Sequence, residues 1–193
     1  MCMTSNDSDI LFYALNSAVN QSQGNERIGS TKVFGEWQDL TAEHFHQRRA
    51  HQAAGLLALG IEHGDHVALY MENSWDWIIA DLALQSIGAV SVPVYTTMSS
   101  ESIAYILQHA SVKAILVSPT FADATFRETV RKIESLNIVV SLSSRMSIHH
   151  QPDVLGGKGA EISLSTEGLE TLGAESLKVH PSVVDEATQK LKG

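Results

Sequence analysis

Short apolar runs alternate with helical patterns between Ala53 and Ser118, and this alternation leaves few folds open to the chain. The runs His66–Met71, Ala89–Val94 and Lys113–Ser118 each have the length of a strand, and helical patterns separate them. Strands that alternate with helices in this way are typical of βαβ units and a parallel sheet. The runs are apolar almost throughout, which predicts that helices cover both faces of the sheet.

Further elements extend this pattern in both directions. The other expected elements are helices at Ile10–Val19, Ala42–Leu59, Asp76–Ile87, Glu101–His109, Phe121–Leu136, Ser165–Leu172 and Val183–Leu191, and strands at Lys32–Trp37 and Asn137–Leu142. We expect Gln38-Asp39 to form the turn after the first of these strands. After Ser143 the periodicity is weak. Together the elements predict an α/β fold with an open, mainly parallel sheet, helices on both faces and right-handed crossovers.

The charge and cysteine content exclude several classes of protein. The net charge is −9, from 22 acidic and 13 basic residues. This argues against a nucleic-acid partner, which needs a basic face, and against a polybasic attachment to anionic lipid. Cys2 is the single cysteine, so no internal disulfide can form, and a reducing cytoplasm is the expected location.

Neither the N-terminal residues nor the most apolar window of the sequence indicates a membrane protein. The first nine residues carry two acids and no base, which does not fit a signal peptide. The most apolar window, Ile78–Val94, contains Asp81, Gln85 and Gly88 and is too interrupted for a transmembrane segment. Peripheral contact with a membrane stays open.

Two motifs invite a chemical interpretation, and each fits a structural one better. Gly156–Gly159 includes a Gly-Lys pair, but Pro152 and Gly159 occupy positions at which a Walker loop needs glycine and a hydroxyl residue. His44 and His46 lie two apart on one expected helix and so point to different faces. His149-His150 have no carboxylate or cysteine at ligand spacing. We therefore predict no metal site and assign no catalytic residue.

Several short blocks carry a family pattern. These blocks are Ala54–Ile61, Gly64–Ala68, Glu72–Ser74, Trp77–Ala83 and Ser86–Tyr95, with Trp37 and Leu40-Thr41 upstream. In these residues the chain resembles the N-terminal part of the acyl-adenylate-forming enzymes, and most closely the AMP-forming long-chain fatty acid–CoA ligases. The resemblance covers roughly residues 30–120. It departs from the family in the first motif, where Ala42 and His44-Phe45 replace an aromatic residue and Glu-Leu.

The resemblance implies a two-step reaction. A fatty acid carboxylate attacks the α-phosphate of ATP to give acyl-AMP and pyrophosphate, and the thiol of CoA then displaces AMP, with Mg²⁺ balancing the phosphate charge. The family's phosphate-binding loop, Tyr-Thr-Ser-Gly-Thr-Thr-Gly-x-Pro-Lys-Gly, has no counterpart in this sequence. The resemblance implies that residue 193 falls at about the point where the strand leading to that loop begins. ATP, Mg²⁺ and CoA are thus implied for a full-length family enzyme, whereas we expect this chain alone to be inactive.

The candidate binding residues follow the first two strands of the sheet. Asn73 and Ser74 come after the first strand, and Tyr95 and Thr96 come after the second. In open α/β sheets, ligands bind outside the carboxyl ends of strands. The competing interpretation is that Ser74 only caps the next helix.

We therefore divide the chain into an N-terminal helix and loop (1–29), a partial AMP-binding-type α/β domain (30–142) and an irregular connector with short helices (143–193). The leading hypothesis is the N-terminal portion of a long-chain fatty acid–CoA ligase. The alternative is a non-catalytic α/β binding or interaction module, either a split half or a regulatory partner of a full-length ligase. A third is an unrelated flavodoxin-like binding domain. We expect a sheet cut from its neighbours to favour self-association.

Overall fold

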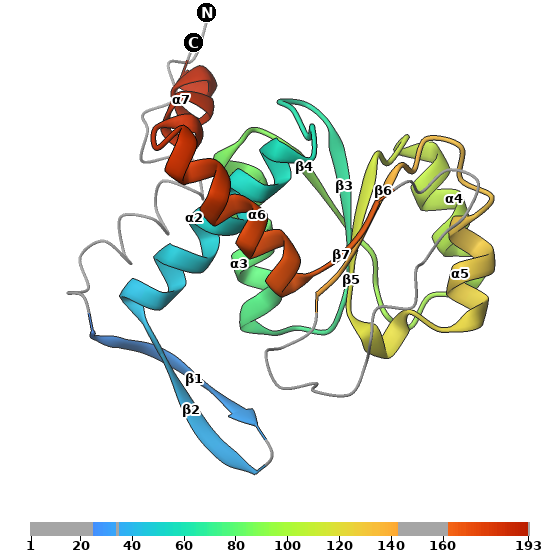
Figure 1. Ribbon diagram of the computed structural model, residues 1–193. Coiled ribbons are helices and arrows are strands. Elements are labelled where there is room, and N and C mark those ends of the chain that lie inside the picture. Colours follow the sequence, from blue (N-terminus) through green and yellow to red (C-terminus); the bar gives the residue numbers. More distant parts are fainter. Residues whose placement is uncertain (1–24, 34, 143–161, 193) are drawn as a thin grey trace, which may run out of the picture. The chain divides into compact units, whose positions relative to one another are not determined.

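The computed structural model describes residues 25–33, 35–142 and 162–192 (Figure 1). The chain divides into two compact units, Met1–Arg49 and Ala50–Gly193. The expected helix at 10–19 and the residues 143–161, which include His149-His150 and the Gly156–Gly159 motif, lie outside the described residues. Our division into three segments stays a prediction.

The first unit contains an antiparallel hairpin where we expected one strand. β1 (Arg27–Val33) pairs with β2 (Glu36–Thr41), and Gly35 forms the turn with a φ of +90°, a conformation that glycine adopts without strain. The predicted strand at Lys32–Trp37 and turn at Gln38-Asp39 were therefore wrong. The polar pair Gln38-Asp39 favours a turn by composition, but it lies on an exposed strand, where polar side chains are tolerated.

The long helix α2 (Ala42–Ala58) begins directly after the hairpin. The Thr41 hydroxyl accepts a hydrogen bond from the backbone N–H of His44, at 3.2 Å, as expected of a residue that caps a helix. The Ala42 N–H donates to the carbonyl of Glu26, at 2.9 Å. The prediction of a helix here is confirmed to within one residue.

The second unit contains a parallel five-stranded sheet, counted over the described residues, in the order β4-β3-β5-β6-β7. Its strands are β3 (His66–Tyr70), β4 (Val90–Pro93), β5 (Ala114–Val117), β6 (Ile138–Ser141) and β7 (Ile162–Ser165). All the neighbouring pairs run parallel. The predicted α/β fold with an open parallel sheet is therefore confirmed.

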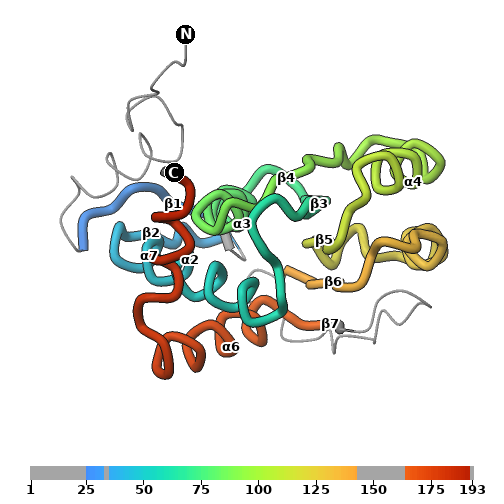
Figure 2. The backbone as a smooth tube through the Cα atoms, turned by 90° about the horizontal axis from the view of Figure 1, so that it is seen from above, coloured from blue at the N-terminus to red at the C-terminus, as the bar shows by residue number. Residues whose placement is uncertain are grey.

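Helices cover both faces of this sheet (Figure 2). On one face, which we call the α3-side face, lie α3 (Trp75–Ser86), α6 (Thr166–Val179) and the last turns of α2. On the other, the α4-side face, lie α4 (Ser100–His109) and α5 (Ala124–Val130).

Alternate residues of each inner strand enter one of two separate cores. In β5, Ala114 and Leu116 pack on the α3-side face, whereas Ile115 and Val117 pack on the α4-side face. Because successive side chains of a strand point to opposite faces, a strand that is buried on both faces must be apolar at every position. This explains the continuous apolar runs in the sequence.

Two glycines let α2 and α6 pack closely on the α3-side face. A Cβ atom added to Gly173 would overlap the backbone carbonyl of His51, and one added to Gly55 would overlap the carbonyl of Leu169. Beside this crossing, the buried Gln52 amide donates from Nε2 to Oε1 of the buried Glu170, at 3.1 Å. Glycine at both positions is therefore required by the close approach of the two backbones.

Two further expectations need correction. Sequence analysis did not predict β7, because Ile162–Ser165 has only two apolar residues and lacks the continuous pattern of the inner strands. The helix expected at Phe121–Leu136 is only α5; a short 3₁₀ helix, η2 (Pro119–Phe121), precedes it, and turns replace helix after Val130. Asp123, whose carboxylate accepts from the Phe126 N–H at 2.8 Å, starts α5. The chain continues from α6 to α7 (Val183–Gln189) and η3 (Lys190–Lys192).

Candidate functional site

The strand order identifies one place in the sheet where a ligand is expected. From β3 the chain moves to β4 on one side, and it then crosses to β5 on the other side. The loops that leave β3 and β5 run to helices on opposite faces, so they diverge at the carboxyl ends of these neighbouring strands. In open α/β sheets such a switch point is the usual place for a binding crevice.

Asn73 and Ser74 lie in the loop that leaves β3, on one side of this switch point. Ser74 is the N-cap of α3, and its hydroxyl accepts a hydrogen bond from the Trp77 N–H at 3.2 Å. Asn73 is exposed. The Ser74 hydroxyl therefore already has a structural partner, and Asp76 in the first turn of α3 adds negative charge where the helix dipole would otherwise attract an anion.

Tyr95 and Thr96 lie one strand further out, after β4 at the edge of the sheet. Tyr95 is 69% exposed, and Thr96 is half-buried. β3 separates their strand from β5, so the structure does not bring them to the same strand pair as the switch point. The assignment of Asn73, Ser74, Tyr95 and Thr96 as binding residues stays a prediction.

Ser118 is a polar residue at the switch point that sequence analysis missed. It follows β5 directly, is only 7% exposed, and its backbone N–H donates to the carbonyl of Tyr70 at 3.0 Å. Among the described residues, none forms a hydrogen bond with its hydroxyl. The signal in the sequence is a serine that ends an otherwise apolar strand next to a proline.

Tyr70 brings a buried phenol to the same strand pair. Its ring stacks on Phe126, with centroids 5.4 Å apart, and lies 5.2 Å from the ring of Phe121. Burial, together with the negative charge of Asp123, raises the pKa of the Tyr70 phenol above its usual value. The phenol is therefore neutral at physiological pH, and it can donate a hydrogen bond.

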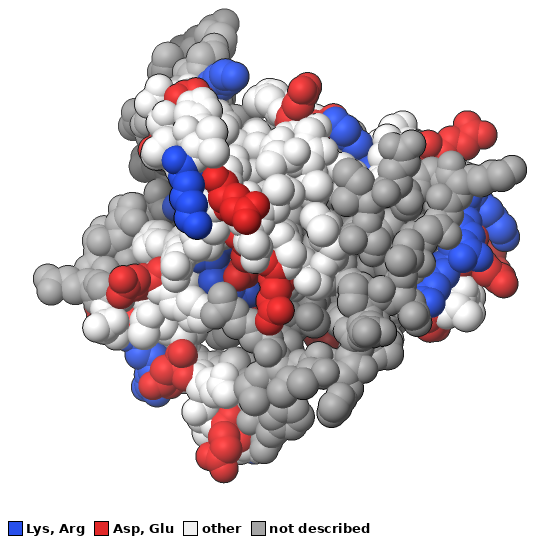
Figure 3. Space-filling view, viewed as in Figure 1, with Lys and Arg blue, Asp and Glu red and all other residues white. Residues whose placement is uncertain are grey.

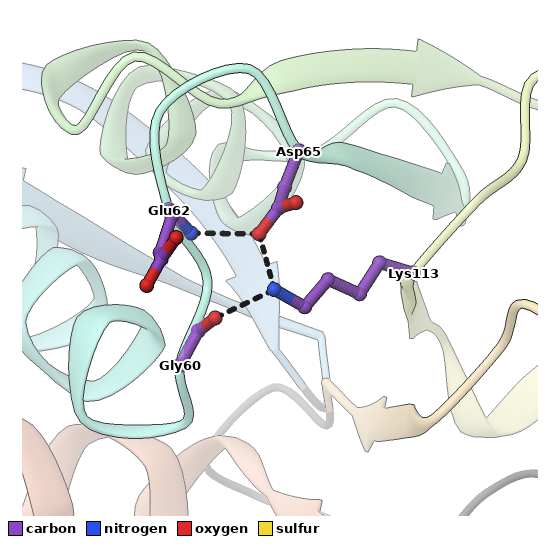
Figure 4. A network of polar contacts seen from close by, with 4 residues as sticks. All are labelled: Gly60, Glu62, Asp65 and Lys113. Atoms are coloured by element: carbon purple, nitrogen blue, oxygen red, sulfur yellow. Dashed lines mark hydrogen bonds and ion pairs between the residues drawn. The ribbon is translucent and has the colours of Figure 1, made fainter.

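The opposite, amino-terminal edge of the sheet carries a structural ion pair (Figure 4). Lys113, just before β5, donates from Nζ to Asp65 Oδ2 at 2.5 Å and to the carbonyl of Gly60 at 2.7 Å. The same carboxylate oxygen accepts from the Glu62 N–H at 2.8 Å. These contacts hold the α2–β3 loop against the sheet. This structural role explains the arrangement of Lys113 and Asp65, and no ligand is needed to explain it.

The distribution of charged and metal-ligating side chains restricts the kinds of ligand that the described surface can bind. On the face shown in Figure 3, acidic and basic side chains are interspersed over most of the described surface, and the basic side chains that gather at the right edge lie next to acidic ones. The described residues also contain no group of three or more His, Cys, Asp or Glu side chains able to hold a metal ion. None of their helices is both long and apolar enough to cross a membrane.

Comparisons with known proteins give the family. The model of the family described as AMP-binding enzyme matches residues 19–177. The long-chain-fatty-acid–CoA ligase FadD15 of Mycobacterium bovis is 39% identical over 94 residues, which make up 48% of this chain and 15% of FadD15. The peroxisomal long chain acyl-CoA synthetase 7 of Arabidopsis thaliana is 27% identical over 173 residues, which make up 90% of this chain and 24% of the synthetase.

A solved structure has the same fold. The adenylation domain of a carboxylate reductase from Mycobacterium chelonae superposes with a TM-score of 0.67 at 17% identity, over 86% of this chain and 29% of that one. The chain thus spans between about a seventh and a third of the lengths of these relatives. Since the family model covers most of the sequence, the chain belongs to the family of AMP-binding enzymes.

Proposed function

We propose that this chain forms part of the α/β scaffold of an AMP-forming ligase that activates a long-chain fatty acid with ATP and transfers it to CoA. The observation that carries the proposal is the match of the family model over residues 19–177, together with 39% identity to a long-chain-fatty-acid–CoA ligase. In this role the switch point between β3 and β5 faces the substrates, and the ion pair of Lys113 and Asp65 holds the opposite edge of the sheet.

We assign no residue of this chain to the ATP–Mg²⁺ site that the family implies. The sequence has no glycine-rich phosphate loop of the family's form, and the described residues contain no cluster of metal ligands. In a complete ligase, ATP with Mg²⁺ would supply the α-phosphate that the fatty acid carboxylate attacks. The residues of this chain would position and enclose the substrates, and we assign none of them to the transfer of the adenylyl group.

A chimera tests the proposal directly. In FadD15, the 94-residue segment that aligns with this chain is replaced by the corresponding residues of this chain. We expect the folded chimera to catalyse palmitate-dependent exchange between ATP and pyrophosphate. A chimera that folds, as judged by circular dichroism and size exclusion, but has no exchange activity would overturn the proposal.

The same assay on the purified chain alone sets the lower limit. We expect no palmitate-dependent exchange, because the phosphate loop is absent from the sequence. Turnover by the isolated chain would contradict this expectation and would show that its own residues bind ATP productively.

A non-catalytic interaction module is the second candidate. This role predicts that the chain binds an intact ligase and changes its rate without any activity of its own. Titration of the chain into intact FadD15 distinguishes the two roles. We place either role in the cytoplasm, in keeping with the single cysteine.

A further inference from the structure

The side-chain amide of Asn73 is exposed in the loop that leads from β3 to α3. The residue lies outside helix and strand, in a bend of the backbone. Among the described residues, none forms a hydrogen bond with this amide. Its carbonyl carbon, Cγ, is therefore accessible to a nucleophile from the neighbouring backbone.

Ser74 supplies that nucleophile, because its backbone nitrogen lies next along the chain. The Ser74 carbonyl accepts from the Ile78 N–H at 3.3 Å, and the Ser74 hydroxyl accepts from the Trp77 N–H at 3.2 Å. The Ser74 N–H, by contrast, donates to none of the residues that the structure describes. The serine side chain is small and lacks the β-branch that would crowd this nitrogen. Its attack on Asn73 Cγ closes a five-membered ring.

The amino end of α3 favours this ring closure electrostatically. Ser74 is the N-cap of α3, so the positive end of the helix dipole lies beside the nitrogen that must lose its proton. It also lies beside the oxygen that gains negative charge in the attack. Asp76 in the first turn opposes this effect in part. The same helix end accommodates a negatively charged product, since a carboxylate is stabilised at this position.

Asn137 is exposed as well, but its surroundings differ in each of these respects. Ile138 follows it as the first residue of β6, and the Ile138 N–H donates to the carbonyl of Lys113 at 3.3 Å. Isoleucine is β-branched, and here it is buried. The nitrogen that would attack Asn137 is therefore both bonded and crowded. The structure thus distinguishes two exposed asparagines, and Asn137 serves as an internal control.

We propose that Asn73 is a site of spontaneous deamidation, through a succinimide formed with the backbone nitrogen of Ser74. The Ser74 nitrogen loses its proton to solvent base and bonds to Asn73 Cγ. The Cγ–Nδ2 bond then breaks, and the departing nitrogen takes up a proton and leaves as ammonia. Water opens the ring at either carbonyl and gives aspartate or isoaspartate. The net reaction consumes one water, releases one ammonia and involves no oxidation or reduction.

The reaction places a new carboxylate at the switch point between β3 and β5. Either product adds negative charge near Glu72 and Asp76, and isoaspartate also lengthens the connection from β3 to α3 by one backbone carbon. ATP and a fatty acid carboxylate are both anionic, so the new charge opposes their approach. This consequence, unlike the site itself, rests on the proposed function.

Peptide mapping of the whole chain after prolonged incubation in mildly alkaline buffer tests the proposal. We expect the peptide with Asn73 to gain about 1 Da and to split into two products, one of which an isoaspartate methyltransferase labels. The peptide with Asn137 should stay unchanged. Ser74→Gly should accelerate the reaction severalfold. Ser74→Thr keeps a hydroxyl at the helix cap but adds a β-branch, and it should slow the reaction severalfold.

The other outcomes would overturn the proposal. A folded chain without a mass gain at Asn73 would exclude the reaction, and equal rates at Asn73 and Asn137 would show that the structure does not select the site. Aspartate without isoaspartate, or rates that both Ser74 variants leave unchanged, would indicate direct hydrolysis of the side chain. Circular dichroism verifies that the variants fold. Because the mapping needs no ligase activity, failure here is separate from failure of the chimera assay.

Discussion

The two faces of the sheet are closed in different ways, although the same strands supply both. The α4-side face is covered by α4 and α5, which lie between β4 and β6 in the chain, and it is filled with large side chains including Tyr70 and Phe126. The α3-side face is closed by α3 and by two helices that come from distant parts of the chain, α2 and α6.

This difference shows that two separate factors limit which substitutions the sheet tolerates. Side-chain volume is the limit on the α4-side face, and backbone contact is the limit at the crossing of α2 and α6. On the α4-side face the contacts are between side chains, and a smaller side chain leaves a gap that neighbours can partly fill. At the crossing of α2 and α6 the contact is between backbones, and a larger residue cannot be accommodated unless the helices separate. Substitutions that add atoms should therefore destabilise the protein most at the crossing of α2 and α6. Substitutions that remove atoms should destabilise it most on the α4-side face.

The largest effect is expected at the backbone contact. Gly173→Ala puts a methyl group onto the carbonyl of His51, so we expect a loss of about 3 kcal/mol in the free energy of unfolding. Urea denaturation followed by circular dichroism measures it. Gly168→Ala on the same helix is the control, because its Cβ would meet Leu164 only at ordinary contact distance, 3.4 Å. Equal effects at both positions would show that helix propensity, and not the crossing, determines the result.

A smaller loss is expected where a side chain is shortened on the α4-side face. Phe126→Leu removes the stacking contact with Tyr70 and leaves a partly filled space, at a cost of about 1.5 kcal/mol. The same denaturation experiment applies. Phe121→Leu, at a half-buried position, should cost less. If Phe126→Leu costs as much as Gly173→Ala, the contrast between the faces is lost.

The α4-side face should also lose stability at high pH through Tyr70. Its pKa is raised by burial and by Asp123, so the folded state holds the phenolic proton more tightly than the unfolded state. This contribution is complete below pH of about 10 and decreases as the pH rises above that value, because the unfolded state then releases the proton. Tyr70→Phe should flatten the decline above a pH of about 10, measured as unfolding free energy against pH. Tyr105→Phe removes an exposed phenol and should leave the decline unchanged.

The smallest effect is expected at the ion pair on the amino-terminal edge. Lys113→Met removes the contacts to Asp65 and Gly60, and since the pair is partly exposed the loss should be about 0.5–1 kcal/mol. It should shrink in 1 M NaCl because salt screens the pair. A loss that does not depend on salt would assign the effect to the aliphatic part of the side chain.

Sequence patterns predicted the inner sheet well because burial on both faces leaves an unambiguous record. Val67–Tyr70 and Ala114–Val117 are apolar at successive positions, and glycine marks the helix end at Gly88. The hairpin and β7 left no such record. Polar residues line the exposed β2, and β7 has an apolar residue only at every second position, which a short helix imitates.

The candidate site was only partly predictable, because strand order is not written in local sequence. Asn73 and Ser74 follow from the rule that ligands bind at the carboxyl ends of strands. That rule alone cannot tell that β5, and not β4, lies across the switch point, so Ser118 and Tyr70 were missed while Tyr95 and Thr96 were included. The family resemblance was confirmed, but the roles of these residues stay predictions.

The crossing of α2 and α6 also sets an order for synthesis. Gln52 and Glu170 are 118 positions apart, so α2 leaves the ribosome long before the helix that covers it exists. The helices α4 and α5 pack only on segments up to β6, so they can pack before α6 is synthesised. Until α6 emerges, Leu56 and its apolar neighbours on α2 stay partly exposed, and exposed apolar surface of this kind favours aggregation.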